Sequence, residues 1–217
     1  MSAEKSCETQ QWKNLSFKLK ARLASEAERG LADRDILPAI YALNSKSCIA
    51  TASSCSGRIA IVSTPSPGDK ARGGVVAKWH RTVTAEELLR ALTSLDPNQN
   101  FVWVTVQPPM ITLYTCSRDA ANTLVRYMLK AGFKYTCSRA VDLGNGAVAY
   151  YISVFSTERI DIPIYFRGSA IITLHTGTIR QLADLVNTYL SLSKQKLERL
   201  LRAVAVASLH VKCSHEP

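Results

Sequence analysis

Residues 141–155 read Val-Asp-Leu-Gly-Asn-Gly-Ala-Val-Ala-Tyr-Tyr-Ile-Ser-Val-Phe. The two glycines look like the entry to a Rossmann-type fold, which requires a helix directly after them so that free backbone amides face the ligand. The residues after the second glycine are instead β-branched and aromatic, which is typical of a strand. Asn145-Gly146 is a strong signal for a type I′ turn. The stretch therefore predicts a hairpin of residues 134–142 and 147–157 and excludes the ordinary Rossmann methyltransferase fold.

Short strands and helices alternate on both sides of this hairpin. Apolar spacing and capping residues predict helices over residues 10–43 (interrupted at Gly30, with a second short helix from Asp33), 84–95, 117–131 and 178–207. Further strands are expected over residues 47–52, 58–63, 75–81, 101–106, 110–115, 162–166 and 170–174. Because short turns link most strands, we expect an α+β fold with antiparallel or mixed sheets, packed helices and two lobes.

The length supports one domain. At 217 residues, 47% of them apolar, the chain buries a sizeable core, which excludes a disordered tail and a disulfide-stapled miniprotein. We expect a single domain over residues 1–217, with a basic N-terminal helical segment (10–45), an αβ core (46–177) and a long C-terminal helix (178–207).

The chain is basic, with 27 lysines and arginines against 17 acids, a net charge of +10. This excess indicates a polyanionic partner such as nucleic acid, because phosphates bound by cations release counterions. Lys194, Lys196, Arg199 and Arg202 line the predicted C-terminal helix, either as a solvated face or as a surface that touches RNA phosphates. A basic protein that is merely soluble is the simpler alternative.

The six cysteines form no CxxC pair and no metal-ligand spacing with the histidines, so we expect no structural zinc site. The N-terminus lacks the apolar segment of a secretory signal, and Pro108-Pro109 interrupts the longest uncharged stretch, which argues against a membrane span. We therefore expect a cytoplasmic protein with mostly reduced thiols, unless the source is a hyperthermophile. The spacing leaves open which cysteines pair.

The segment 51–58, Thr-Ala-Ser-Ser-Cys-Ser-Gly-Arg, lies between two predicted strands. A tight turn here would present hydroxyl and amide donors to a carboxylate or phosphate, and Arg58 would add a two-pronged contact. The alternative is a plain hydroxyl-rich turn. His80 ends a predicted strand and could contact a base or phosphate. Asp33 stands at a helix start, where a carboxylate is stabilised by the helix dipole, and this structural explanation is sufficient by itself.

The order of these features resembles the tRNA wybutosine-synthesizing protein 3 family. The hallmark is Ser53-Ser-Cys-Ser-Gly-Arg58 followed by Ile59, after a helix that ends in Leu43-Asn44. His80, Pro108, Ala-Gly-Phe at 131–133 and Ile162-Pro-Ile164 continue the resemblance, which covers about residues 12–204. We expect an archaeal homologue.

The resemblance implies an S-adenosylmethionine-dependent methyltransferase that acts on N4 of a 4-demethylwyosine-type base next to the anticodon of phenylalanine tRNA. It implies no metal. Carried over by position, the site for the cofactor or a substrate anion consists of Ser53, Ser54, Ser56, Gly57 and Arg58, and the candidate proton acceptors or base-positioning residues are Asp33 and His80. The chain departs from the family pattern at residues 25–30 and at Gln107, where glutamate is common, which leaves the exact wyosine derivative open. The alternative function is a non-catalytic protein that binds the anticodon loop, and its test is salt-sensitive tRNA binding without binding of the methyl donor.

Overall fold

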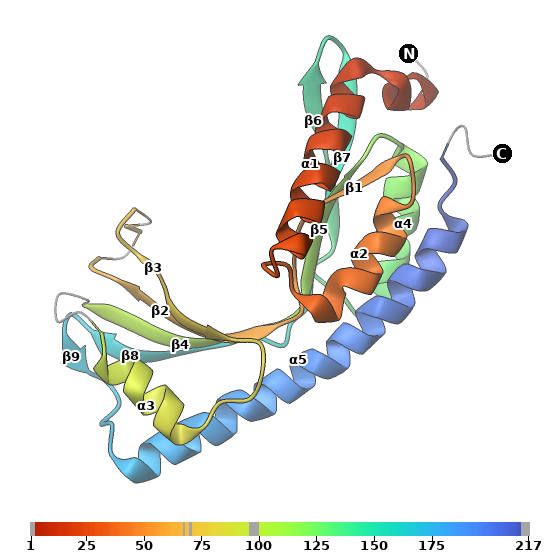
Figure 1. The fold of residues 1–217 in the computed structure, drawn as a ribbon. Helices are drawn as coiled ribbons and strands as arrows, with labels where there is room; N and C mark the ends of the chain where they lie inside the picture. Colours follow the sequence, from red (N-terminus) through yellow and green to blue (C-terminus); the bar gives the residue numbers. More distant parts are fainter. Residues whose placement is uncertain (1–2, 67, 70, 96–99, 214–217) are drawn as a thin grey trace. The chain divides into compact units, whose positions relative to one another are not determined.

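The computed structural model describes residues 3–66, 68–69, 71–95 and 100–213. The chain forms two compact units, each assembled from separate stretches (Figure 1). The first unit comprises residues 1–56, 109–157 and 196–217, and the second comprises residues 57–108 and 158–195. Each unit has its own hydrophobic core. The interpretation of the chain as a single domain stays a prediction.

The first unit contains a four-stranded antiparallel sheet in the order β1-β5-β7-β6. Its strands are β1 (Ile49–Cys55), β5 (Met110–Thr115), β6 (Cys137–Gly144) and β7 (Ala147–Phe155). Its helices are the 3₁₀ helices η1 (Ala3–Glu8) and η2 (Arg34–Ile36), with α1 (Gln10–Glu28), α2 (Leu37–Asn44), α4 (Arg118–Lys130) and the C-terminal part of α5 (Thr176–His210). Apolar residues from the sheet, α1, α2, α4 and α5 make one core, in which Phe133, Ile40 and Leu124 are almost fully buried.

The second unit contains a five-stranded antiparallel sheet in the order β3-β2-β4-β8-β9. Its strands are β2 (Arg58–Thr64), β3 (Gly74–Trp79), β4 (Phe101–Gln107), β8 (Ile160–Phe166) and β9 (Ser169–Ala170). Helix α3 (Ala85–Thr93) and the N-terminal part of α5 supply the rest of its core, which includes Leu88 and Val186. The predicted α+β class with antiparallel sheets and packed helices is therefore confirmed.

Local sequence signals account for most element boundaries. The hairpin is confirmed, with positive φ angles of 53° at Asn145 and 74° at Gly146, as a type I′ turn requires. The predicted capping box is present, because Thr84 accepts from the Glu87 amide and the Glu87 side chain accepts from the Thr84 amide. Ser117 caps α4 through the Ala120 amide, also as predicted.

The predicted strand over residues 170–174 is wrong beyond Ala170. Ile171 makes one more ladder-like bond, from its amide to the Ile164 carbonyl, and the chain then turns to begin α5. His175 Nδ1 accepts a hydrogen bond from the Thr178 amide at 3.2 Å. This side chain therefore satisfies one of the backbone amides in the first turn of α5 that have no partner within the helix.

The thiols are not mostly reduced, because four of the six cysteines are paired, which is the exception that the sequence analysis allowed for a hyperthermophile. Disulfides join Cys7 to Cys116 and Cys48 to Cys213, both within the first unit. The paired Cα atoms lie 5.0 and 5.5 Å apart, within the range that a disulfide needs. These pairs are far apart in the sequence, and only the folded unit brings them together. Among the described residues, no helix is both long and apolar enough to cross a membrane.

Candidate active site

The hallmark segment is not the tight turn that its composition suggested. Ser53 and Ser54 lie inside strand β1, where they pair with Thr112 and Ile111 of β5. The register shifts between Thr51 and Ser53, as at a β-bulge. Pairing continues after it to Cys55, three residues beyond the predicted end of the strand at residue 52. β-Pairing with β5 thus overrides the turn propensity of the two consecutive serines.

Two buried residues follow this strand. Ser56 is fully buried, and Gly57, which belongs to the second unit, is also buried. By contrast, Ser53 is exposed and Ser54 half-buried at the end of β1. Neither serine hydroxyl has a hydrogen-bond partner among the described residues. The hydroxyls that a ligand could reach are therefore those of the strand and not that of Ser56.

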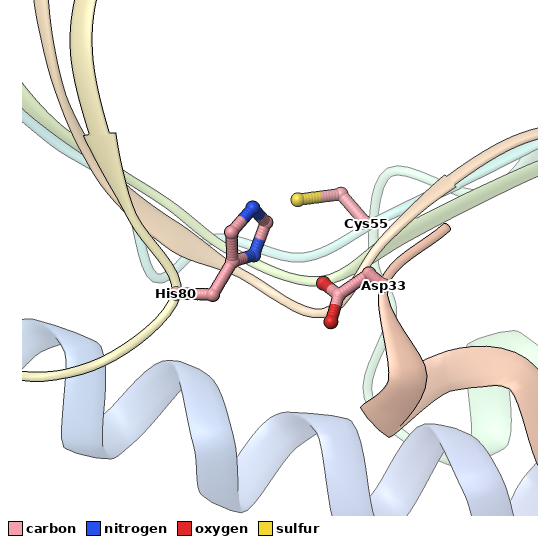
Figure 2. A group of neighbouring side chains, drawn as sticks. All are labelled: Asp33, Cys55 and His80. Atoms are coloured by element: carbon pink, nitrogen blue, oxygen red, sulfur yellow. The ribbon is translucent and has the colours of Figure 1, made fainter. Parts of the chain in front are cut away.

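Asp33 reaches the end of this strand from the loop before η2. Although it occupies the N-cap position of η2, its side chain makes no cap hydrogen bond there. Its Oδ2 instead accepts from the backbone amide of Ser56 at 2.8 Å. A carboxylate oxygen of Asp33 also lies within 4.8 Å of the Cys55 sulfur. Figure 2 shows both side chains. The helix-dipole explanation of Asp33 is thus incomplete, because the carboxylate holds the hallmark segment in place.

The start of β1 is fixed by α2 through Asn44. Its Oδ1 accepts from the Thr51 amide at 2.9 Å, and its Nδ2 donates to Thr51 Oγ1 at 3.0 Å. Lys20 of α1 donates to the Asn44 and Lys46 carbonyls, and burial lowers the pKa of this lysine. The Leu-Asn helix end named in the resemblance therefore anchors the strand that carries the hallmark serines.

Gly57 lies in the second unit, against α5. Its φ of 93° is one that L side chains rarely adopt. A Cβ built on it would lie 2.1 Å from Ser193 Oγ and 3.3 Å from the Gln107 carbonyl oxygen. The sequence analysis missed Ser193, which is fully buried and whose hydroxyl has no partner among the described residues. Only glycine fits this position, for both conformational and packing reasons.

Arg58 begins strand β2 and is half-buried. Its Nε donates to Oε1 of Gln107 at 2.8 Å, and the two residues are paired in register across β2 and β4. Within the described part of the chain, the two terminal nitrogens of the guanidinium have no hydrogen-bond partner. A guanidinium held in this way is suited to a two-pronged contact with a carboxylate.

His80 belongs to the second unit and follows Trp79, the last residue of β3. It is half-buried, and it lies one residue beyond the end of β3, although the sequence predicted a strand that continues to residue 81. Figure 2 shows its imidazole side chain. The structure thus brings Asp33, Cys55 and Ser56 together in the first unit, and Gly57, Arg58, Gln107 and Ser193 in the second.

The match to a known family decides the wider assignment. The family model described as Methyltransferase TYW3 matches residues 9–206, most of the chain. The chain belongs to this family. Its membership confirms the resemblance drawn from the hallmark, and it makes the chain a member of a methyltransferase family.

Curated TYW3-family relatives are about 30% identical to the chain over the aligned residues. A Thermococcus sibiricus protein is 30% identical over 191 residues, which are 87% of this chain and 93% of that protein. An Archaeoglobus fulgidus protein is 31% identical over 86% of this chain and 89% of its own length. Both are named tRNA(Phe) 7-((3-amino-3-carboxypropyl)-4-demethylwyosine(37)-N(4))-methyltransferase.

Solved structures agree with the TYW3-family fold. The PH1069 protein from Pyrococcus horikoshii is 26% identical, with a TM-score of 0.76 over 92% of this chain and 97% of that chain. A protein from Aeropyrum pernix, 22% identical, shares the fold with a TM-score of 0.64 over 81% of this chain and 98% of its own. The exclusion of a Rossmann arrangement is therefore confirmed.

Proposed function

We propose that the chain methylates N4 of a 4-demethylwyosine-type base in tRNA(Phe). The observation that carries this proposal is the family match over residues 9–206, together with relatives of that named activity at 30–31% identity over most of the chain. The net charge of +10 suits a polyanionic substrate. No observation favours the alternative of a non-catalytic tRNA-binding protein. Because the proposed substrate is a tRNA, we also propose that the protein acts in the cytoplasm.

We propose S-adenosylmethionine as the methyl donor. When bound, it supplies an activated methyl group on a sulfonium, and it carries a carboxylate. Arg58 of the second unit fits that carboxylate, because no described residue engages its two terminal nitrogens. In the first unit, the hydroxyls of Ser53 and Ser54 are likewise unengaged, and we propose them as donors to the cofactor or to a substrate anion. Ser56 and Gly57 are both buried, and the Ser56 amide already donates to Asp33, so we propose that these two residues support the site by positioning their neighbours.

Asp33 and His80 are the proposed proton acceptors or base-positioning residues. In the balanced reaction, the N4 lone pair forms the new N–C bond, the electrons of the broken C–S bond remain on sulfur, and N4 loses one proton. A positioned carboxylate or imidazole that takes this proton contributes about 10²- to 10⁴-fold to the rate. The Ser56 amide already orients Asp33, which supports a fixed position for this carboxylate. The chemistry needs no metal in this proposal, because the sulfonium is already an activated electrophile.

The decisive experiment is transfer of a labelled methyl group from S-adenosylmethionine to precursor-modified tRNA(Phe). The expected result is one methyl group per tRNA, located at N4 by mass spectrometry of the released nucleoside. No transfer by the folded protein to a correctly modified precursor would overturn the proposal, and binding of tRNA without binding of the donor would instead support the non-catalytic alternative.

Single substitutions then separate the proposed roles. Asp33→Asn and His80→Gln keep size and hydrogen bonding but remove a proton acceptor, so we expect kcat to fall at least tenfold for whichever residue takes the proton. Arg58→Ala is expected to raise KM for the donor, with partial recovery in Arg58→Lys. Thermal melting of each variant distinguishes loss of function from loss of fold. A folded Arg58→Ala variant with unchanged donor KM would remove Arg58 from the donor site.

A further inference from the structure

A second basic feature of the first unit lies away from the hallmark residues. An open hollow of about 460 Å³ is lined by residues at the end of α4 and on the C-terminal part of α5. Figure 1 shows these two helices. The hollow is lined by Tyr127, Lys130, Ala131, Arg199, Arg202, Ala203 and Val206. We call it the α4–α5 groove.

Helical spacing explains why these side chains meet. Lys130 follows Tyr127 by three positions on α4, and Arg202 and Val206 follow Arg199 by three and seven positions on α5. Residues at these spacings share one face of a helix. The groove is therefore lined both by charged groups and by the apolar stems of the lysine and arginine side chains. Ala131 and Ala203 also line it, and their small side chains leave its space unfilled.

The charges in the groove are of one sign. Lys130, Arg199 and Arg202 are all exposed, and none of the lining residues is acidic. In the described part of the chain, no carboxylate lies within ion-pair distance of these three cations. Cations that are exposed and uncompensated on a concave surface attract a polyanion more strongly than cations held in ion pairs.

An aromatic residue borders the same groove. The Tyr127 ring lies 5.2 Å from the His210 ring, centroid to centroid, and the Arg126 guanidinium lies 5.7 Å from the Tyr127 centroid. These contacts hold an aromatic face and a further cation beside the groove. Interleaved cations and aromatic rings are typical of RNA-binding surfaces, where the rings stack on sugars or bases.

One nearby lysine has a structural role and sets the geometry of the groove. Lys196 donates to the Gly132 carbonyl at 3.3 Å, and its ammonium lies 5.8 Å from the centre of the buried Phe133 ring. It thus ties α5 to the residues that follow α4. This contact helps to hold the backbone of α5 beside the end of α4, so less of the groove has to be ordered when a ligand binds.

We propose that the α4–α5 groove binds the phosphate backbone of the tRNA substrate, with Lys130, Arg199 and Arg202 on phosphates. The inference rests on the proposed function only for the identity of the RNA. Because the cations contact phosphate and not a base edge, the groove contributes affinity and orientation rather than recognition of the modified base.

The test is tRNA binding by fluorescence anisotropy, without methyl donor, over a range of salt concentrations. The variant Lys130→Ala/Arg199→Ala/Arg202→Ala removes the three groove cations. We expect it to bind tRNA(Phe) about 10- to 100-fold more weakly at low salt, and the slope of log K against log salt to become shallower by about 2 to 3, since each phosphate contact contributes about 0.7 to 0.9.

The matched control is Lys13→Ala/Lys18→Ala/Arg29→Ala, which removes three exposed cations associated with α1 in the same unit. We expect its affinity and slope to stay within about threefold and 0.5 of the unmodified protein. Arg199→Lys/Arg202→Lys should keep the slope, because a lysine also neutralises a phosphate. Equal weakening in the groove variant and the control, or an unchanged slope in a folded groove variant, would overturn the proposal.

Two outcomes keep this inference separate from the proposed function. If the unmodified protein binds tRNA through the groove but transfers no methyl group, the methyltransferase proposal fails and the groove assignment stands. If transfer occurs and the groove variant retains full tRNA affinity and salt slope, the groove assignment fails and the methyltransferase proposal stands.

Discussion

Arg58 donates its Nε hydrogen to Oε1 of Gln107 at 2.8 Å, and the two residues face each other in register on strands β2 and β4. The bond leaves both terminal nitrogens of the guanidinium without a hydrogen-bond partner in the described part of the chain. A neutral amide at position 107 orients the arginine without neutralising it. Gln107, which stands where the family resemblance leads us to expect a glutamate, thus lies beside Arg58, a proposed donor-binding residue.

Replacing Gln107 tests whether that orientation matters. Gln107→Leu removes the acceptor, leaves a half-buried Nε hydrogen unsatisfied, and is expected to raise KM for S-adenosylmethionine about tenfold with little change in kcat. Gln107→Glu restores an acceptor, and its KM should stay within about threefold of the unmodified enzyme. Steady-state kinetics at saturating tRNA measure both values. Equal KM values for the leucine and glutamine forms would show that Arg58 needs no partner.

The contact between Gly57 and Ser193 predicts strong coupling. Gly57→Ala adds a Cβ 2.1 Å from Ser193 Oγ at a φ of 93°, so we expect a loss of roughly 2 to 4 kcal/mol in the free energy of unfolding. Ser193→Ala removes a buried hydroxyl that lacks a described partner and should be neutral or stabilising by up to about 1 kcal/mol.

Denaturant unfolding of both single variants and the double variant completes this cycle. The double variant should recover about 1 kcal/mol or more, because the clashing oxygen is gone while the strained φ remains. Strict additivity of the two changes would contradict the close approach of Gly57 to α5.

The disulfide between Cys48 and Cys213 is expected to stabilise the first unit. It closes a span of 165 residues, and constraint of so long a loop in the unfolded chain is worth about 2 to 5 kcal/mol. Cys48→Ala/Cys213→Ala should therefore melt at a lower temperature under non-reducing conditions. Under full reduction the two proteins should melt within a few degrees of each other, and a gap that persists there would assign the effect to packing instead.

Acid should weaken the start of α3 through Glu87. The hydrogen bond from Arg81, followed by that from the Thr84 amide, lowers the pKa of Glu87 from 4.5 to about 2. Because the folded pKa is the lower one, the stabilisation is complete above pH 4.5 and is lost as the pH falls from 4.5 towards 2. Thermal melts of the unmodified protein and Glu87→Gln should differ at pH 7 and converge in that acidic window. A difference that is independent of pH would exclude the ion pair as its source.

Much of the fold follows from local signals that tertiary structure leaves intact. The Asn145-Gly146 turn, the capping box at Thr84 and the Ser117 cap each depend on residues within a few positions, and all three are present. The end of β1 could not be predicted, because it depends on pairing with β5, which is more than fifty residues away. The disulfides were missed for the same reason, since cysteine spacing says nothing about which cysteines folding brings together.

The candidate site could be predicted only in part. The family resemblance supplied the candidate residues by position, and their proposed roles stay predictions: Asp33, Ser53, Ser54, Ser56, Gly57, Arg58 and His80. Composition suggested a turn of exposed hydroxyls, but Ser56 is buried and its amide binds Asp33. Gln107 was visible only as a departure from the family pattern, and Ser193 gave no sequence signal at all, because its importance arises from packing against Gly57.

The chain passes between the two units four times, and this has a consequence for its synthesis. All segments of the second unit have been translated once Gln195 is added, whereas the first unit still lacks its final helical turns and Cys213. Domains made on the ribosome fold as their residues emerge. The first unit therefore begins before the second unit and is completed after it, and Cys48 must wait until another 165 residues have been added before its partner Cys213 exists.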